Sequence, residues 1–485
     1  MTASLSRFYI YKKSEISLGT SRFLLLKNSD NEKYLYVEGE KSDSFNDPAA
    51  EVAEGCIFPL TNENAYQLAG IFPWLKPQKL GRKKAFGFGD RIGLAAPGHL
   101  KSIEKYDVKP VLAQQSIREM DRVNRSPEDV IASSIWGAFE RNYTGGFGAD
   151  ADHLKTEEDV KKSAAAGFKM FTCDPGAEVY NISNMSEDEI LKIFNGIECS
   201  DNLLDKYLDR SFLVKSDRTD DEFELTFNRE DVIMSSVKYF YAVEKAIKMY
   251  FQLRKEFNGN NFDYEISVDE TASPTTPKEH LFIVRELIDK EVEFESIAPR
   301  FRGDFEKGID YKGEIGELKE NLKIHSAIAE SFGNYKLSFH SGSDKFSIYP
   351  LISEILADRY HVKTSGTSYL EAVRVAASKK PEIFNQIYDL SRINFPEARK
   401  SYNISAQLEK VPELSEIDAE DYPGCLDRDE IRQVLHVTYG SILEGDEISK
   451  AFYQCLQEYD SLHYNFLSEH LDKHLNLLEQ QERRK

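Results

Sequence analysis

The chain has 485 residues, of which 41 % are hydrophobic, and its formal charge is −21. This is the composition of a globular protein, with enough length for about two to four domains or for one large barrel with additions. So negative a charge argues against nucleic acid or an anionic membrane surface as a partner. No segment has the apolar length of a signal peptide or a membrane span.

The cysteines are few and scattered. There are five of them, an odd number, and none forms a CxxC pair: Cys56, Cys173, Cys199, Cys425 and Cys455. This pattern is typical of a reducing compartment and excludes a disulfide framework or a thiolate zinc site. We therefore expect a cytoplasmic protein.

The middle of the chain alternates short apolar runs with helical patterns. Each run is followed by Gly, Asp, Ser or Thr and then by an amphipathic segment, which indicates βα units and a parallel sheet. Eight such runs predict a closed (β/α)8 barrel, an α/β fold of the TIM type. The runs are residues 84–89, 110–114, 145–150, 168–173, 262–268, 294–301, 335–339 and 360–364.

Composition shifts divide the chain into three parts. We expect a small N-terminal α/β cap over residues 1–80 and the barrel over 81–380. A largely helical insertion at about 178–258 interrupts the barrel, because it is far longer than an ordinary βα connection. Residues 381–485 are predicted to form a helical C-terminal extension.

Candidate metal ligands and acids follow the predicted strands. In such a barrel the C-terminal strand ends carry function. The third strand is followed by Asp152-His153 and the seventh by His340, and a divalent metal suits such imidazoles and carboxylates. In the fifth strand, alternation places Glu265 inside the barrel, where it needs a metal, a proton or a cation. An ion pair with a lysine such as Lys363 is the alternative role for this carboxylate.

Other histidines fit structural roles better. His325 lies on the apolar side of a predicted helix, and His361 begins the eighth strand without a clear role. His470 and His474 have i, i+4 spacing, but the sequence HLDKH lacks the glutamate of a zinc protease. We expect this pair to be part of an amphipathic C-terminal helix.

Several sequence blocks resemble a known family. Asp152-His153 and the His340-Ser341-Gly342-Ser343 segment locally resemble class II, metal-dependent aldolases. A more specific resemblance covers nearly the whole chain and is to the tagaturonate epimerase (tagaturonate/fructuronate epimerase) family. Its blocks here include FGFGDRIGLAAPGH, GFGADADHLK, MFTCDP, EISVDET, FEKGIDYKG, YKLSFHSGSDKFSIYP and HVKTSGTSYLEAVRV.

The resemblance implies an epimerase of hexuronate catabolism that interconverts D-tagaturonate and D-fructuronate with a divalent metal. Asp152 would be the proton acceptor and Glu265 the proton donor. His153 and His340 would hold the metal, with Glu306 as the favoured third ligand and Asp304 as the reserve. Zn²⁺, Mn²⁺, Ni²⁺ and Co²⁺ are not distinguished by such ligands.

Polar groups near the strand ends are the candidates for substrate binding. A set that would bind the sugar hydroxyls comprises Gln114, Gln115, Ser116, Thr172, Asp174 and Thr364. A second set would seat the carboxylate and comprises Ser341, Gly342, Ser343 and Lys345. Because the whole chain is acidic, an anionic substrate needs local cations, for which we name the metal, Lys345, Lys363 and Arg91.

The two ketouronates differ at a hydroxyl-bearing carbon β to the ketone, whose hydrogen the carbonyl does not acidify. A retro-aldol cleavage followed by re-addition to the other aldehyde face is therefore the favoured route. An aldolase that releases the fragments, or a non-catalytic sugar-acid-binding protein, remains an alternative. The expected partner is a small-molecule ketouronate, without nucleic acid or membrane, and the sequence leaves homo-oligomerisation open.

Overall fold

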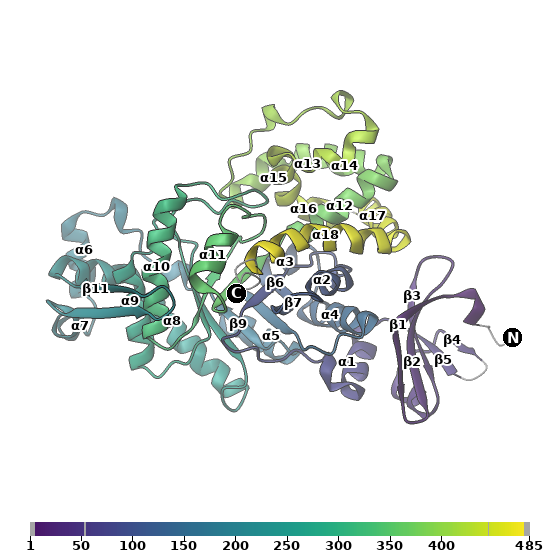
Figure 1. Cartoon of the computed structure of the whole chain (residues 1–485), viewed down its shortest axis with the longest axis horizontal. Helices are drawn as coiled ribbons and strands as arrows, with labels where there is room; N and C mark the ends of the chain where they lie inside the picture. The colour runs from purple at the N-terminus through teal and green to yellow at the C-terminus, as the bar shows by residue number, and fades with distance from the viewer. Residues whose placement is uncertain (1–4, 53–54, 445, 480–485) are drawn as a thin grey trace.

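The computed structural model describes residues 5–52, 55–444 and 446–479. An antiparallel sheet, a closed barrel and a group of helices follow one another along the chain. In Figure 1 the sheet lies at the right, the barrel in the centre and the C-terminal helices at the top. None of the described helices combines the length and apolar composition needed to cross a membrane.

The N-terminal sheet has the strand order β1-β2-β3-β5-β4, with every pair antiparallel. Alternating side chains of β2 supply its two apolar faces, Phe23 and Leu25 to the main core and Leu24 and Leu26 to a smaller cluster. The elements are β1 (Tyr9–Leu18), β2 (Ser21–Lys27), β3 (Lys33–Glu38), β4 (Ala50–Val52), β5 (Gly55–Pro59) and the helix α1 (Asn62–Ile71).

Eight parallel strands close the barrel, and β15 pairs with β6 to complete it. The prediction of a (β/α)8 barrel is confirmed, and each of the eight predicted apolar runs overlaps a barrel strand. The strands are β6 (Ala85–Phe88), β7 (Lys109–Ser116), β8 (Gly148–Leu154), β9 (Met170–Cys173), β12 (Asp263–Val268), β13 (Ser296–Pro299), β14 (Lys336–Phe339) and β15 (Tyr360–Thr364).

Helices surround the barrel, and several begin where the sequence provides a cap. Ser126 caps α4 through a reciprocal capping box with Asp129, and Pro127 occupies the first turn. The helices are α2 (Ala96–Ile103), α3 (Ile117–Arg122), α4 (Pro127–Arg141), α5 (Glu157–Ala166), α9 (Pro277–Asp289), α10 (Ile315–Ser331), α11 (Tyr349–Leu356) and α12 (Thr367–Lys379).

The insertion between β9 and β12 is mostly helical, as its composition suggests, but it also contains an antiparallel hairpin that we did not predict. The hairpin contacts α10, and the insertion lies at the left of Figure 1. Its elements are α6 (Glu187–Asn195), α7 (Ser200–Tyr207), β10 (Ser211–Ser216), β11 (Asp221–Thr226) and α8 (Arg229–Glu256).

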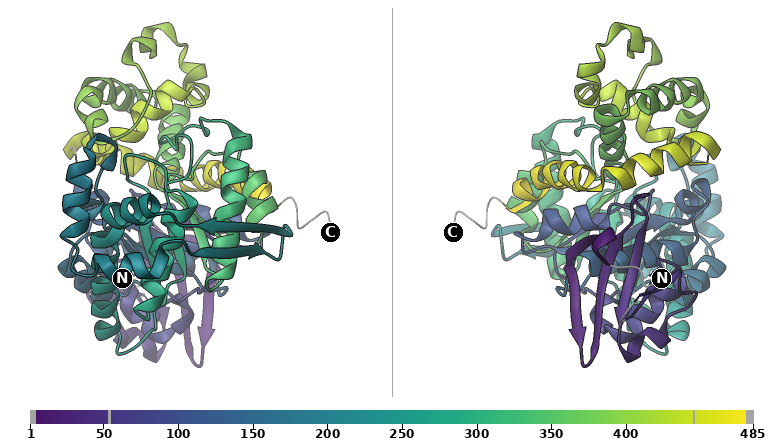
Figure 2. Two further views of the ribbon diagram at one scale, coloured as in Figure 1. Left: turned by 90° about the vertical axis from the view of Figure 1, so that its left-hand side faces the viewer. Right: turned by 90° about the vertical axis from the view of Figure 1, so that its right-hand side faces the viewer.

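The C-terminal region is helical and returns to the barrel. Figure 2 shows its last helix, drawn in yellow, running across the barrel, where it contacts α2, α11 and α12. A buried row of Leu467, Leu471, Leu475 and Leu478 on this helix joins the main core. The helices are α13 (Pro381–Ala398), α14 (Tyr422–Cys425), α15 (Asp429–Val437), α16 (Tyr439–Leu443), α17 (Asp446–Glu458) and α18 (Asp460–Glu479).

Candidate active site

A bulge near the end of β8 presents two neighbouring polar side chains to one cavity. The pairing of β8 with β9 shifts in register between Ala151 and Leu154. Within this stretch His153 has φ +54°, a conformation that residues with side chains adopt rarely. Because a bulge interrupts the alternation of side chains, Asp152 and His153 both line the barrel mouth rather than opposite faces.

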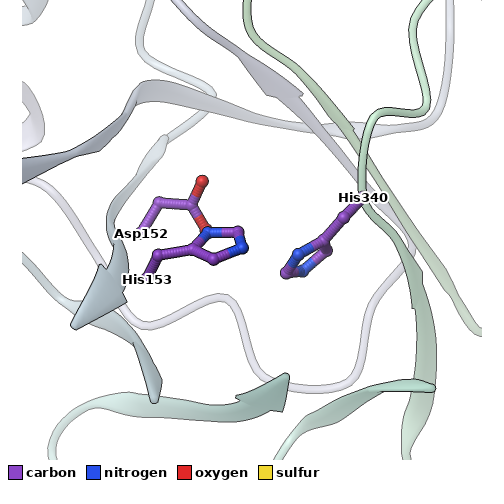
Figure 3. A group of neighbouring side chains, drawn as sticks. All are labelled: Asp152, His153 and His340. Atoms are coloured by element: carbon purple, nitrogen blue, oxygen red, sulfur yellow. The ribbon is translucent and has the colours of Figure 1, made fainter. Parts of the chain in front are cut away.

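The imidazoles of His153 and His340 face each other across this mouth (Figure 3), with ring centres 4.9 Å apart. Each ring is oriented by a carboxylate on one nitrogen. His153 Nδ1 lies 2.9 Å from Asp152 Oδ1, and His340 Nε2 lies 2.8 Å from Glu265 Oε1. Asp152, His153 and His340 have ligand atoms close enough to share a metal ion, and we call them the mouth group.

The other nitrogen of each ring points toward a third carboxylate. Asp269 Oδ1 lies 3.2 Å from His340 Nδ1 and 3.8 Å from His153 Nε2. His153 Nε2 is buried and has no hydrogen-bond partner among the described residues. The sequence interpretation did not select Asp269, although it follows β12 on the same side as Glu265.

Lys363 lies beneath the mouth group and connects the carboxylates of the barrel interior. Its Nζ is 2.8 Å from both Asp152 Oδ1 and Glu265 Oε1, 2.7 Å from Asp150 Oδ2 and 2.6 Å from Thr172 Oγ1. Glu265 is fully buried and faces inward, as alternation predicts, and the alternative ion pair with Lys363 is present as well. Ionic contacts therefore occupy an interior that aliphatic layers usually fill.

These contacts set the protonation of the carboxylates. Burial opposes ionisation, but His153 and Lys363 hold the pKa of Asp152 well below its usual range. Lys363 and His340 do the same to the pKa of Glu265 against the same cost of burial. Burial dominates at Asp150, and its pKa rises to about 6. Asp152 is thus ionised at neutral pH and can accept a proton.

Two connected cavities open at the C-terminal ends of the strands. The inner cavity, about 40 Å³, is lined by Gln114, Ser116, Asp152, His153, Asp269, His340, Lys363 and their neighbours. The outer cavity is about 350 Å³ and extends toward Arg300, Asp304, Tyr402 and Asn403. Arg118, Asp269, Glu270, Lys307, His340, Ser341 and Tyr402 line both cavities. The mouth group is therefore accessible to a small polar molecule.

Only part of the predicted substrate-binding set lines these cavities. Gln114 and Ser116 line the inner one, and Ser341 lines both. The others lie outside the linings: Gln115, Thr172, Asp174, Thr364, Gly342, Ser343 and Lys345. Strand alternation explains one of these differences, because Gln115 has to point away from its neighbours on β7.

The structure does not bring Glu306 to the two imidazoles. Its carboxylate accepts hydrogen bonds from Ser405 N, Ser405 Oγ and Gln433 Nε2 at 2.7–2.8 Å, and Lys312 Nζ lies 3.3 Å away. These contacts tie the loop after β13 to the C-terminal region. Asp304, the reserve ligand, lines the outer cavity.

Two predicted cations are also engaged elsewhere. Lys345 Nζ donates to the backbone carbonyls of Glu306, Ser343 and Ile309, and burial lowers its pKa to about 7. Arg91 is buried, 2.7 Å from a Glu119 oxygen and stacked on Tyr439. Neither side chain presents a free cation to the cavities.

A second set of ligand-type atoms lies at the contact between α18 and the loop after β14. It consists of Asp344, His470 and His474, and we call it the buried group. His470 Nε2 is 2.6 Å from Asp344 Oδ1, and Asp344 N donates to His474 Nε2. Arg432 and Thr367 occupy the other carboxylate oxygen at 2.9 and 2.7 Å. A third set, His153, Asp174 and Glu270, overlaps the mouth group.

Comparisons with known proteins agree over nearly the full length. The UxaE family model, described as tagaturonate epimerase, matches residues 11–478. A tagaturonate/fructuronate epimerase from Thermotoga maritima is 39 % identical over 476 residues, 97 % of each chain. The glycerol-complexed crystal structure of fructuronate-tagaturonate epimerase UxaE from Cohnella laeviribosi has a TM-score of 0.92 at 34 % identity, covering 98 % of this chain and 97 % of that one.

The native crystal form of that Cohnella protein gives the same TM-score and identity, covering 97 % of this chain and 96 % of that one. By contrast, the YdjI aldolase from Escherichia coli K12 has a TM-score of 0.35 at 10 % identity. The similarity to aldolases is therefore weak and adds nothing to the local motif resemblance.

Proposed function

Because the chain belongs to the tagaturonate epimerase family, a family of isomerases, we propose that it interconverts D-tagaturonate and D-fructuronate. The observation that carries this proposal is the mouth group itself: an ionised carboxylate beside two imidazoles, lining a cavity at the functional end of the barrel. The outer cavity, which His340 also lines and which adjoins the inner one beside Asp152, has a size and polarity that suit a six-carbon sugar acid.

The reaction inverts a carbinol carbon β to the ketone. Asp152 removes the proton of its hydroxyl group, and the bond between this carbon and the neighbouring α-carbon breaks. The electron pair passes into the enediolate of the ketone fragment, and the carbinol carbon becomes an aldehyde. Rotation of the aldehyde and re-addition to its other face give the epimer, with the proton returned to the new alkoxide.

A divalent metal fits the donor atoms at the mouth. Three donor atoms converge here: His153 Nε2, which has no hydrogen-bond partner among the described residues, His340 Nδ1 and Asp269 Oδ1. Carboxylates orient the opposite ring nitrogens, as in many protein metal sites. We propose these three side chains as the ligands, with Asp269 in the role that the sequence interpretation gave to Glu306. Bound there, the metal supplies Lewis-acid stabilisation of negative charge on the ketone fragment. Zn²⁺, Mn²⁺, Ni²⁺ and Co²⁺ all accept this ligand set.

Because its pKa is held low, Glu265 is ionised at rest, and it fills the role of proton donor that the family resemblance implies only after it takes up the proton that Asp152 removes from the substrate. It lines neither cavity, so it reaches the reaction through its contacts with His340 and Lys363. Lys363 contacts both Asp152 and Glu265 and thereby couples the two carboxylates electrostatically. Gln114, Ser116 and Ser341 line the cavities and supply hydrogen bonds to the sugar hydroxyls.

Metal analysis and a tagaturonate assay before and after chelation test this proposal. We expect about one divalent ion per chain, formation of fructuronate, loss of activity on chelation and recovery when metal is restored. Metal-loaded protein that produces no fructuronate would contradict the proposal. Accumulation of a free three-carbon aldehyde would assign an aldolase instead, and binding without turnover would assign a sugar-acid-binding protein.

The same assay in deuterated water tests the mechanism. Retro-aldol cleavage breaks a carbon–carbon bond and leaves the C–H bond of the carbinol carbon intact. The product should therefore retain protium at that carbon. Incorporation of deuterium at that carbon would replace the retro-aldol route with direct proton removal.

A further inference from the structure

The linings of the two cavities hold five acidic side chains against four lysines and arginines, although the proposed substrate is itself an anion. Two of the cations at the mouth already face carboxylates. Lys363 contacts three carboxylates, and Arg118 lies 3.7 Å from Glu270. Arg300 lines only the outer cavity, where its guanidinium group keeps its charge but donates to the backbone carbonyl of Thr271. A substrate carboxylate therefore finds few unpaired positive charges here.

Lys307 is the exception among the cations that line both cavities. Its side chain is half-buried, and its Nζ forms no hydrogen bond or ion pair with any residue in the described ranges. A half-buried ammonium group without a partner loses hydration and gains no compensating contact. Such a group is suited to bind an anion that enters from outside.

The backbone around Lys307 is fixed by buried side chains from elsewhere in the fold. Four consecutive carbonyl oxygens each accept a hydrogen bond from a side chain, at 2.5–3.2 Å. The pairs are Glu306 with Lys345, Lys307 with Gln433, Gly308 with Arg432, and Ile309 with Lys345. The Glu306 carboxylate adds its bonds to Ser405 and Gln433. This support holds the backbone of an otherwise irregular loop in place and preorganises Lys307.

We propose that Lys307 binds the carboxylate of the ketouronate, an inference that rests on the proposed function. Retro-aldol cleavage leaves this carboxylate on the aldehyde fragment, two bonds from the carbon that is inverted. Lys307 then retains the fragment while its aldehyde group turns, and the carbon–carbon bond re-forms from the other face. Glu306 and Lys345 are positioning residues for the Lys307 loop, and α15 of the C-terminal region completes its support.

Four proteins test this inference: wild type, Lys307→Met, Lys307→Arg and Lys161→Met, the last an exposed lysine of α5 that lies outside both cavities. Each is compared in melting temperature, metal content, KM and kcat for tagaturonate, and in direct binding of tagaturonate by calorimetry. Should Lys307→Met fail to fold, Lys307→Gln replaces it.

We expect Lys307→Met to raise KM about 10- to 100-fold, the worth of a hydrogen bond between charged groups, with melting temperature and metal content unchanged. Lys307→Arg should recover most of this loss, and Lys161→Met should equal wild type. An unchanged KM in Lys307→Met, with wild-type turnover intact, would overturn the Lys307 inference alone. If wild type binds tagaturonate but does not epimerise it, the proposed function fails. The tagaturonate affinity of Lys307→Met, compared with that of wild type, then still tests whether Lys307 binds the carboxylate.

Discussion

The mouth group and the buried group consist of the same residue types, one aspartate and two histidines each, yet their surroundings differ. In the mouth group, His153 Nε2 has no hydrogen-bond partner within the described part of the chain, and the side chains line a cavity. In the buried group, Arg432 and Thr367 complete the contacts of Asp344, and the group lines neither cavity at the mouth. Unused bonding capacity and access, rather than residue type, distinguish a site from a structural network.

The buried group connects two distant parts of the chain. It connects the loop after β14 to α18 across more than a hundred residues of sequence. His474 Nδ1 donates to the carbonyl of His470, which fixes its ring, while Asp344 N occupies Nε2. An arginine so close to the carboxylate also disfavours a metal cation. The comparison leads to predictions in which the two groups respond differently.

The largest expected effect is on turnover at the mouth group. Asp152→Asn removes the proton acceptor while leaving its shape, so kcat should fall by about 10²–10⁴-fold with metal still bound. Steady-state rates and metal analysis of the same preparation measure this. The matched change in the other group, His470→Gln, should leave kcat within about twofold of wild type, because that group lines neither cavity at the mouth. Full activity in Asp152→Asn would remove the basis for the distinction.

The second largest expected difference between the mouth group and the buried group is in metal binding. His153→Ala removes a proposed ligand. Metal affinity should fall by more than about 100-fold, because replacing even a residue that only hydrogen-bonds to a ligand lowers metal affinity by about 10- to 100-fold. His474→Ala should keep the wild-type metal content. Competition with a chelator of known affinity gives both values. Loss of metal in His474→Ala with retention in His153→Ala would reverse the assignment.

The free energy of unfolding, by contrast, should depend on the buried group. Asp344→Asn leaves Arg432 buried without its carboxylate, which should cost about 3–5 kcal/mol of unfolding free energy at neutral pH. Burial alone would raise the pKa of Asp344, but Arg432 and His470 hold it well below its usual range. Its contribution is therefore present above the pKa of an unfolded carboxyl, about 4, and is lost as pH falls toward the folded value.

Urea unfolding of wild type and Asp344→Asn at several pH values measures this contribution. The difference in stability should be largest near pH 7 and should narrow progressively below about pH 4. A difference that stays constant across this range would mean that the charge of Asp344 does not stabilise the fold.

Much of the fold could be predicted because each barrel strand carries a local signal. The apolar runs, the caps such as Ser126 and the alternation that turns Glu265 inward all depend on neighbouring residues. The hairpin β10–β11 was missed because its two strands are short and lie within a segment whose other patterns are helical, although DEFELT does alternate polar and apolar residues.

The positions of the candidate site residues were predictable to different degrees for a related reason. His153 lies near the end of β8 and His340 directly follows β14, so their strand positions bring them together. Glu306 and Lys345 are in loops. The contacts of Glu306 depend on how the distant residues Ser405 and Gln433 fold over it, and Lys345 in turn bonds to backbone carbonyls of the Glu306 loop. No pattern within FEKG or GSDK encodes that packing. That Lys307 Nζ lacks a partner among the residues described by the structure likewise becomes visible only in the folded chain.

Metal-loaded protein should interconvert two ketouronates at the barrel mouth. Incubating it separately with tagaturonate and with fructuronate, and following both compounds by nuclear magnetic resonance, measures this interconversion. We predict that the two reactions converge on the same mixture without free fragments. Two unchanged solutions, or one that accumulates three-carbon products, would contradict it.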